Sequence, residues 1–421
     1  MMSQAHPQPP AVRDPKRVAG SAALLMFLLI LIAYSVNAMD RQVFPVLLEE
    51  VRGEYNFGLP QAGLQSTLFA LGMGVTGIPA GIAMRNLSRK NVIILGTLVF
   101  SVATALTVVS FGFWDMLVWR ILSGIGEALQ LVAILTVASH AFPKRRGMAI
   151  GSVNMAFAAG SIIGPNLGVL VRDSFDTWRA PMISFAIIGA VAAVLLFVGV
   201  RKAFSEQDSG PEETLEHVGG ATSFFSRNPL ILGIITVLFG LIDFGFIGMY
   251  ASFTQDSLGF TQSDAAFAVG LAGLAAFASP LGGWLVDRLS VRASIAWLSV
   301  AQAVCGVALF VGPATLGWQS VWAFLFGLVA SSGIYVGLAA SLVKSMHADH
   351  ASRASGMFTS CIYLGAGVAG LIFGLIVDAA GWQAAGLIQI TGLSIVSVIL
   401  TFALRAKEFS RLATVPVTPK E

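Results

Sequence analysis

Five charged residues lie within long apolar runs of the sequence, and their types suit the handling of protons and anions. They are Asp40, Arg41, Arg120, Glu127 and Asp243. A charge inside the hydrocarbon layer of a membrane is costly, so an ionisable residue there marks a functional site by default. We predict that the three carboxyl groups carry protons. The two arginines are candidates for binding an anionic substrate.

Two of these charges are neighbours in the stretch SVNAMDRQVFP, near the outer end of the first apolar run. Adjacent residues of a helix point about 100° apart, so Asp40 and Arg41 cannot both face one partner. Arg120 and Glu127 are seven residues apart in another run, which puts them on one face of a helix. We expect one of Asp40 and Arg41 to face this helix, and the other to face a neighbouring helix or a cavity.

The charges of Asp40, Arg41, Arg120 and Glu127 sum to zero when all four are ionised. One interpretation is that Asp40 and Arg120 form a buried ion pair that fixes two helices, although such pairs stabilise weakly. The other is that protonation of Asp40 or Glu127 releases an arginine, so that a proton and an anion bind together. Asp243 has no charged neighbour in its run. It is either a protonated acid bonded to another helix, or a second proton or hydroxyl-binding site.

Polar and aromatic residues within the apolar runs are further candidates for contact with a substrate. Tyrosine suits this use, because its ring packs while its hydroxyl group bonds a ligand. Each of these residues is equally open to a simple role in hydrogen bonding between helices. The candidates are Tyr34, Asn37, Gln130, Asn154, Tyr250, Tyr335 and Tyr363.

The apolar runs that hold these residues are long enough to be membrane-spanning helices. The chain has 421 residues, of which 56% are hydrophobic and 11% are charged, and its mean hydropathy is +0.80. A helical span needs about 20 apolar residues, and the sequence therefore predicts an all-α membrane protein with twelve spans. The predicted spans are 21–48, 60–84, 91–112, 115–139, 147–171, 180–200, 229–254, 263–287, 293–313, 318–343, 354–378 and 382–404.

The positions of the basic residues predict the orientation of the chain. Short loops on the cytoplasmic side of a membrane retain Lys and Arg. With the amino terminus inside, 20 of the 25 Lys and Arg residues fall in cytoplasmic segments. We therefore predict a multi-pass protein of the inner (plasma) membrane with both termini in the cytoplasm. The net charge of +3 reflects this bias and gives no indication of nucleic-acid binding.

A long polar stretch divides the predicted spans into two groups of six. The two groups share weak sequence matches, such as GIAMRNLSRK after the second span and GWLVDRLSVR after the eighth. A duplication of this kind is typical of secondary transporters, whose substrate site lies between the repeats. The predicted regions are a cytoplasmic tail at 1–20, a helix bundle at 21–200, a flexible cytoplasmic linker at 201–228, a second bundle at 229–405 and a cytoplasmic tail at 406–421.

The whole chain resembles the major facilitator superfamily, which implies a fold of two pseudo-symmetric six-helix bundles. The superfamily has a loop motif, G-x-x-x-D-R-x-x-[R/K], whose Asp caps a helix end and pairs across helices to hold an inner gate shut. Arg85 stands where the first copy of the motif should have Asp, so we expect Asp287 to carry more of this latch. The motif is also open to a role as a simple anchor at the inner face. The candidate gate residues are Gly81, Arg85, Arg89, Gly283, Asp287, Arg288 and Arg292.

Three further motifs are similar to the organic anion–cation symporter branch of the superfamily. They are MDR in the first span, WRILSGIGEALQ in the fourth, and AFPKRRGMAIGS after it. The resemblance implies that Asp40, Arg41, Arg120 and Glu127 serve proton coupling and anion binding. Spinster-like lipid transporters share the GIGEA stretch and an Asp-Arg pair in the first span, so the motifs do not separate the two branches.

Two functions stay open at this point. The first is uptake of a small organic anion, such as a carboxylate, by proton symport and alternating access; the transporter would be a monomer in the lipid bilayer, with protons as the coupling ion and no cofactor or metal. The alternative is a proton-driven exporter of a lipid, drug or other amphipathic compound, which the exporter-like Gly164-Pro165 pair favours. We do not expect an enzyme, because no loop is long enough for a catalytic domain.

Overall fold

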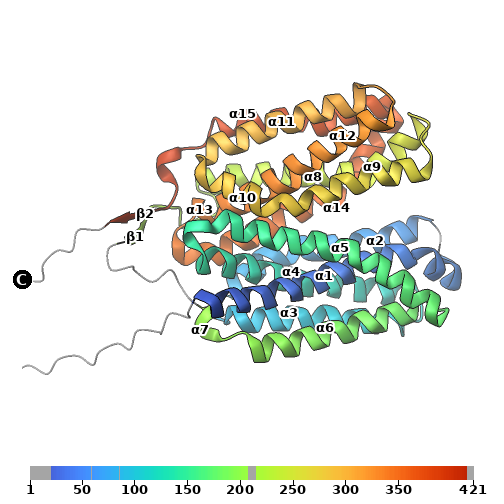
Figure 1. Cartoon of the computed structure of the whole chain (residues 1–421), viewed down its shortest axis with the longest axis horizontal. Helices are drawn as coiled ribbons and strands as arrows, with labels where there is room; N and C mark the ends of the chain where they lie inside the picture. Colours follow the sequence, from blue (N-terminus) through green and yellow to red (C-terminus); the bar gives the residue numbers. More distant parts are fainter. Residues whose placement is uncertain (1–19, 58, 85, 207–214, 415–421) are drawn as a thin grey trace, which may run out of the picture.

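A computed structural model shows that the chain is almost entirely helical (Figure 1). It describes residues 20–57, 59–84, 86–206 and 215–414. Within these residues, the strands are two short segments, β1 (Leu215–Val218) and β2 (Arg411–Thr414), which pair antiparallel.

The helices follow the apolar runs of the sequence closely. In the first half of the chain they are α1 (Gly20–Tyr55), α2 (Leu59–Ala83), α3 (Arg89–Thr107), α4 (Phe113–Ala141), α5 (Arg146–Phe175), α6 (Arg179–Gly199) and the short α7 (Lys202–Ser205). In the second half they are α8 (Arg227–Asp256), α9 (Gln262–Leu274), α10 (Ser279–Arg288), α11 (Val291–Val311), α12 (Leu316–Gly327), α13 (Val336–Ser345), α14 (Ala351–Ala385) and α15 (Leu393–Thr401). A 3-10 turn at Ala275–Ala278 joins α9 to α10, and π-helical segments at Leu328–Tyr335 and Gly386–Gly392 precede α13 and α15.

Within the described residues, ten stretches are long and apolar enough to cross a membrane. The longest, Ala351–Thr401, contains a break at Gly381, whose φ of 84° and ψ of 171° are not helical. Glycine tolerates this backbone region because it has no Cβ, and the break separates the predicted spans 354–378 and 382–404. A shorter apolar helix, Phe69–Ala83, lies within the predicted span 60–84. The all-α membrane class is therefore confirmed, while the count of twelve stays a prediction.

The serine shared by both copies of the repeated loop motif caps the start of a helix. Ser88 and Ser290, which occupy matching positions in the two copies, each precede a helix. Their hydroxyl oxygens accept hydrogen bonds from the backbone N–H groups of Asn91 and Ala293, both at 3.3 Å. Such N-caps satisfy amide groups that a helix start leaves without partners. The motif thus begins α3 and α11 in the same way.

The helices form two layers that lie one over the other (Figure 1). One layer contains α1 to α6 and the other α8 to α15, and both ends of the described chain lie at the same end of the molecule. We call this the terminal end, where α1 and α5 begin and α10 and α13 finish. The layers meet mainly through α2 against α14 and α5 against α10.

Glycines allow the layers to approach closely near the terminal end. A Cβ at Gly151 of α5 would clash with the carbonyl oxygen of Ser279, and a Cβ at Gly283 of α10 would clash with that of Gly147. Small residues at such crossings let helix backbones pack closely within a membrane. The two halves are therefore held tightly together at this end.

At the opposite end, α1 continues beyond the predicted boundary at 48. Its last turns are amphipathic, and the buried Leu47 and Val51 join a small core with Trp178 and Met182. Glu54 accepts hydrogen bonds from the indole Nε1 of Trp178 at 2.7 Å and from Nη1 of Arg179 at 2.8 Å. These contacts tie the end of α1 to the start of α6.

We expect the contacts of Glu54 to stabilise the protein above acidic pH. The hydrogen bonds from Arg179 and Trp178 hold the pKa of Glu54 below its ordinary value of 4.5. A carboxyl group with a lowered pKa contributes stability above its unfolded pKa, and this contribution is lost as the pH falls through the folded value. Glu54→Gln should lower the free energy of unfolding at pH 7 by roughly 0.2 to 1 kcal/mol, a small effect because the pair is exposed to solvent.

Thermal unfolding of the purified protein at several pH values measures this effect. Asp256→Asn, at the exposed end of α8, is the matched control because Asp256 has no hydrogen bond or ion pair to a described residue. Equal melting temperatures for Glu54→Gln and the parent protein at pH 7 would contradict the expectation.

Candidate functional site

Arg41 lies at the centre of a buried polar cluster and joins three helices. Its Nε donates to Glu127 of α4 at 2.7 Å, and both side chains are almost fully buried. Its Nη1 donates to the hydroxyl group of Tyr363, on α14 of the other half, at 2.6 Å. The guanidinium carbon also lies 5.0 Å from the centroid of the Phe157 ring of α5. One side chain of α1 thus contacts both halves of the protein.

Amide and hydroxyl side chains orient this pair from the first half. Asn37 accepts from Nη2 of Arg41 at 3.2 Å and donates to Gln130 at 2.8 Å. Gln130 in turn donates to the hydroxyl oxygen of Thr97 at 2.8 Å. Ser123 donates to the second carboxylate oxygen of Glu127 at 3.1 Å. The predicted residues Asn37 and Gln130 therefore lie in the same network as the charged pair.

Asp40 faces away from Arg41, as the adjacency of the two residues requires. Its Oδ2 accepts a hydrogen bond from the hydroxyl group of Thr104, on α3, at 2.8 Å. Its Oδ1 is buried and has no hydrogen-bond partner among the described residues. No ion pair links Asp40 to Arg120 in this part of the chain, although the two lie within electrostatic range of each other; their interpretation as a fixing pair stays a prediction.

Arg120 is a buried cation whose side chain forms no ion pair with a described residue. It is 1% exposed, and its Nε and Nη2 have no hydrogen-bond partner among the described residues. Its guanidinium carbon lies 4.4 Å from the ring centroid of Phe44 and 5.5 Å from that of Phe69. A buried cation with open donors is costly. This arrangement leaves the N–H groups of two nitrogen atoms without acceptors.

Three tyrosines and Asp243 lie around the same centre. The hydroxyl group of Tyr34 lies beside that of Tyr335, whose ring packs edge-on against Phe358 with 5.0 Å between centroids. Asp243, on α8, is half-buried and within electrostatic range of Tyr335 and Tyr363. It has no hydrogen bond or ion pair to a described residue. The structure therefore places Asp243 on the second-half side of the same group of tyrosines.

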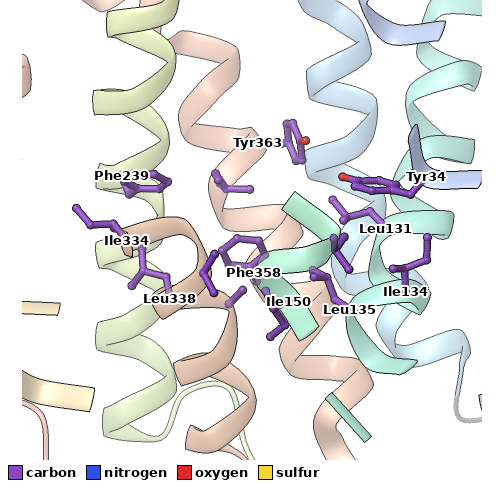
Figure 2. Close-up of a cluster of buried hydrophobic side chains, with 14 of the residues drawn as sticks. Tyr34, Leu131, Ile134, Leu135, Ile150, Phe239, Ile334, Leu338, Phe358 and Tyr363 are labelled. Carbon is purple, nitrogen blue, oxygen red and sulfur yellow. The ribbon is translucent and has the colours of Figure 1, made fainter. Parts of the chain in front are cut away.

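A layer of apolar side chains from both halves lies on the terminal side of Tyr34 and Tyr363 (Figure 2). Its members come from α4, α5, α13 and α14. They include Leu131, Ile134, Leu135, Ile150, Leu338 and Phe358. Because these side chains are buried, the layer separates the polar cluster from the terminal end.

Two predicted substrate contacts lie apart from this cluster. Asn154 donates to the hydroxyl oxygen of Ser279 and to the carbonyl oxygen of Ser331, both at 2.9 Å, and so bridges the halves near the terminal end. Tyr250 donates to Gln319 at 2.7 Å and packs in an aromatic core of the second half. The polar atoms of both residues are therefore already used in contacts between helices.

The second copy of the loop motif forms a contact between the halves. Oδ2 of Asp287 accepts from the backbone N–H groups of Gly147 at 2.9 Å and Met148 at 3.4 Å, at the start of α5. Its Oδ1 lies 3.3 Å from Nζ of Lys344. Asp287 thus caps one helix and pairs with another, as the resemblance implies. Arg85, at the matching position of the first copy, lies outside the described residues.

The other gate candidates contact different partners. Gly81 packs against the backbone of Ser352 on α14, which brings the halves together in the same way as Gly283. Arg288 and Arg292 lie over the rings of Trp284 and Phe402 in their own half. Arg89 donates to the carbonyl oxygen of Ser205 at 3.2 Å. Each of these three arginine contacts lies within one half.

Sequence reasoning missed Thr104, Ser123 and the aromatic rings beside the arginines. Ser123 is four residues from Glu127, a spacing that places both on one helix face and could have been used. Thr104 has no charged neighbour in its run, so nothing in the sequence indicated that it contacts Asp40. Within the described residues, no group of three His, Cys, Asp or Glu is arranged to hold a metal ion.

Curated relatives of this chain are transporters of several kinds. It is 25% identical over 304 residues to the "Cis,cis-muconate transport protein" of Acinetobacter baylyi, covering 68% of this chain and 72% of that protein. It is 24% identical over 402 residues to the "Hexuronate transporter" of Bacillus subtilis, covering 88% and 92%. It is also 27% identical over 329 residues to the "Tetracycline resistance protein, class D" of Salmonella ordonez, covering 76% and 80%.

The fold is similar to that of a solved transporter. The crystal structure of FucP, described as a Major Facilitator Superfamily transporter in the outward conformation, superposes with a TM-score of 0.71 at 17% identity. The match covers 91% of this chain and all of that one. The sequence profile of the Major Facilitator Superfamily matches residues 30–370. The chain therefore belongs to the major facilitator superfamily of transporters.

Proposed function

We propose that this protein is a twelve-span secondary transporter that takes up a small organic anion together with protons. The observation that carries the proposal is Arg120, a buried cation whose Nε and Nη2 are open, within electrostatic range of the carboxyl group of Asp40, which has one open oxygen. A carboxylate or similar anion would supply the missing acceptor. The names of the muconate and hexuronate relatives support an anionic substrate.

The geometry supports a coupling of proton and anion binding. Arg41 is engaged by Glu127 at 2.7 Å, so it cannot serve a substrate while that carboxylate is charged. Protonation of Glu127 weakens this ion pair and frees Arg41, while protonation of Asp40 removes a negative charge near Arg120. In both cases the proton raises the positive potential of the site, and an anion binds more tightly. The coupling ion is therefore the proton, and no other cofactor is needed.

The contacts between the halves support alternating access. We infer that the terminal end faces the cytoplasm, with both termini on that side of the inner membrane, because basic residues concentrate there. The apolar layer, the close glycine contacts and Asp287 all lie between the polar cluster and this end. In this state the protein is closed toward the cytoplasm. Separation of α5 from α10 would open it.

Export of a drug or another amphipathic compound is the second candidate. It is favoured by the tetracycline-resistance relative and by the second half, where the one embedded acid among the described residues, Asp243, has no basic partner. Gly164, of the exporter-like Gly164-Pro165 pair, is weaker evidence for export, because a Cβ there would lie 2.6 Å from Cα of Met39. This glycine is needed for the packing of α5 on α1 in either direction of transport. The direction of proton-driven flux distinguishes the two candidates.

Replacement of Arg120 should weaken anion binding. A hydrogen bond to a charged group contributes about 1.5 to 3 kcal/mol, so Arg120→Gln should raise the apparent dissociation constant of an anion about 10- to 100-fold. Binding of cis,cis-muconate and of a hexuronate to the purified protein measures this change. Arg172→Gln, on the exposed surface, is the control. Unchanged binding of every anion that the parent protein binds would refute the role of Arg120.

Replacement of the two acids should separate proton coupling from exchange. Asp40→Asn and Glu127→Gln keep the shape of the site but carry no titratable proton. In liposomes, each variant should lose accumulation driven by a pH gradient by at least about tenfold, while one of them keeps exchange of the same anion across the membrane. Asp173→Asn, at the exposed end of α5, should behave as the parent protein. Accumulation that does not depend on a pH gradient in the parent would overturn the symport proposal.

A larger side chain at the crossing of α5 and α10 should shift the protein toward the inward-open state. Gly151→Val places methyl groups against the backbone of Ser279, where no space exists. Labelling of a cysteine introduced at Ile150 should become faster from the terminal side. The same cysteine in a Gly270→Val background is the control, because a Cβ at Gly270 meets no atom within 4 Å. Equal labelling rates in the two backgrounds would contradict the proposed gate.

A further inference from the structure

A groove of about 540 Å³ opens on the surface of the second half, away from the cluster around Arg41. It lies between α11, α12 and the segment that leads into α15. Val304 stands on its α11 wall, and Thr391, Ile395 and Val398 form its opposite wall. The hydroxyl group of Thr391 donates to the carbonyl oxygen of Ala303 at 3.4 Å, so the lining is apolar. Since these helices belong to candidate spans, the groove faces the hydrocarbon of the bilayer.

The wall on α15 continues to an exposed aromatic ring at the terminal end. Thr391, Ile395 and Val398 follow one face of the helix at spacings of four and three residues, and the next position on that face is Phe402. At 1.5 Å per residue, Phe402 is about 16 Å from Thr391. This is close to half of the ~30 Å hydrocarbon core of a bilayer. The stripe therefore runs from the middle of the membrane to its inner boundary.

A basic side chain sits where this stripe ends. The guanidinium carbon of Arg292 lies 5.1 Å from the centroid of the Phe402 ring. Arg292 is exposed and has no hydrogen bond or ion pair to a described residue. Arg227 lies nearby and donates to the carbonyl oxygen of Ala403 at 2.8 Å. The boundary of the groove thus carries positive charge with donors open to the surroundings.

The cation at the matching position of the first half is hydrogen-bonded. Lys90 aligns with Arg292 in the repeated motif and lies 5.2 Å from the ring of Phe197. Its ammonium group, however, donates to the carbonyl oxygen of Phe197 at 2.6 Å. The cation of the first half is therefore already bonded, while that of the second half is open.

We propose that the groove binds an anionic diacyl phospholipid. Arg292 holds the phosphate group, and one acyl chain lies along Phe402, Val398 and Ile395 into the groove. A basic residue at the membrane surface attracts anionic lipids, and the apolar lining suits a hydrocarbon chain and gives a free phosphate ion nothing to bind. The basic end of the site at Arg292 and its apolar end in the groove therefore both favour an anionic phospholipid.

Native mass spectrometry of the full-length protein in detergent tests this proposal. The probes are dioleoylphosphatidylglycerol and dioleoylphosphatidylcholine, which share acyl chains and differ in net charge. The parent protein should retain the anionic lipid more strongly. Arg292→Gln should reduce this retention about fivefold, to the level of the neutral lipid. Val304→Trp, on a residue that is 51% exposed, should fill the groove and reduce the retention of both lipids.

The first half supplies matched controls for both changes. Lys90→Gln removes a cation at the equivalent position, and Val194→Trp adds the same bulk on the exposed face of α6. Neither should change lipid retention. If Val304→Trp does not fold, Ile395→Phe blocks the groove from its other wall.

Three results would overturn the proposal. They are equal retention by the parent and both groove variants, equal retention of the two lipids by the parent, and a dimer mass that is lost in the groove variants. The last result would assign the groove to a second copy of the chain.

Discussion

The cost of placing charge in a bilayer governs the arrangement of this protein. Arg41 and Glu127 are almost fully buried and neutralise each other at 2.7 Å. Nη2 and Nη1 of Arg41 each donate to a neutral acceptor, Asn37 on its own helix and Tyr363 on α14. Since Tyr363 belongs to the other half, the ionisation of one pair is linked to the contact between the bundles. The positions of α1, α4 and α14 relative to one another depend on this group of bonds.

Arg120 and Asp40 differ from Arg41 and Glu127, because no ion pair to a described residue neutralises their charges. Both are buried, yet each has atoms without a partner in the described chain. Aromatic rings partly offset the cost for Arg120, since a cation over a ring is stabilised by the ring quadrupole. An aromatic ring stabilises the cation without taking up its N–H donors in hydrogen bonds. The rings therefore hold the guanidinium group of Arg120 in place and leave its N–H groups free. A transporter needs a site that is stable when empty and stronger when filled.

Much of this arrangement follows from the sequence, but not all of it. Helix positions follow from apolar length and from caps such as Ser88 and Ser290, and the divergence of Asp40 and Arg41 follows from the 100° step of a helix. The partner of Asp40 does not follow, because the tilt of α3 decides which of its threonines is in reach. The surroundings of Tyr250, in an aromatic core of the second half, do not follow for a similar reason. Position along a span sets depth in the membrane, whereas the face of a helix that meets a cavity depends on tertiary packing.

The pairing of β1 with β2 has a consequence for how the protein is made. β1 belongs to the segment between the two bundles, and β2 follows the last helix. Residue 221 of the same segment also pairs with Met346, after α13. The central segment is synthesised before the second bundle, so residue 221 can pair only after α13 has been made, and β1 only after α15 has been made. The ribbon thus joins the segment between the two bundles to the segment after the last helix, and it closes only when both have been synthesised.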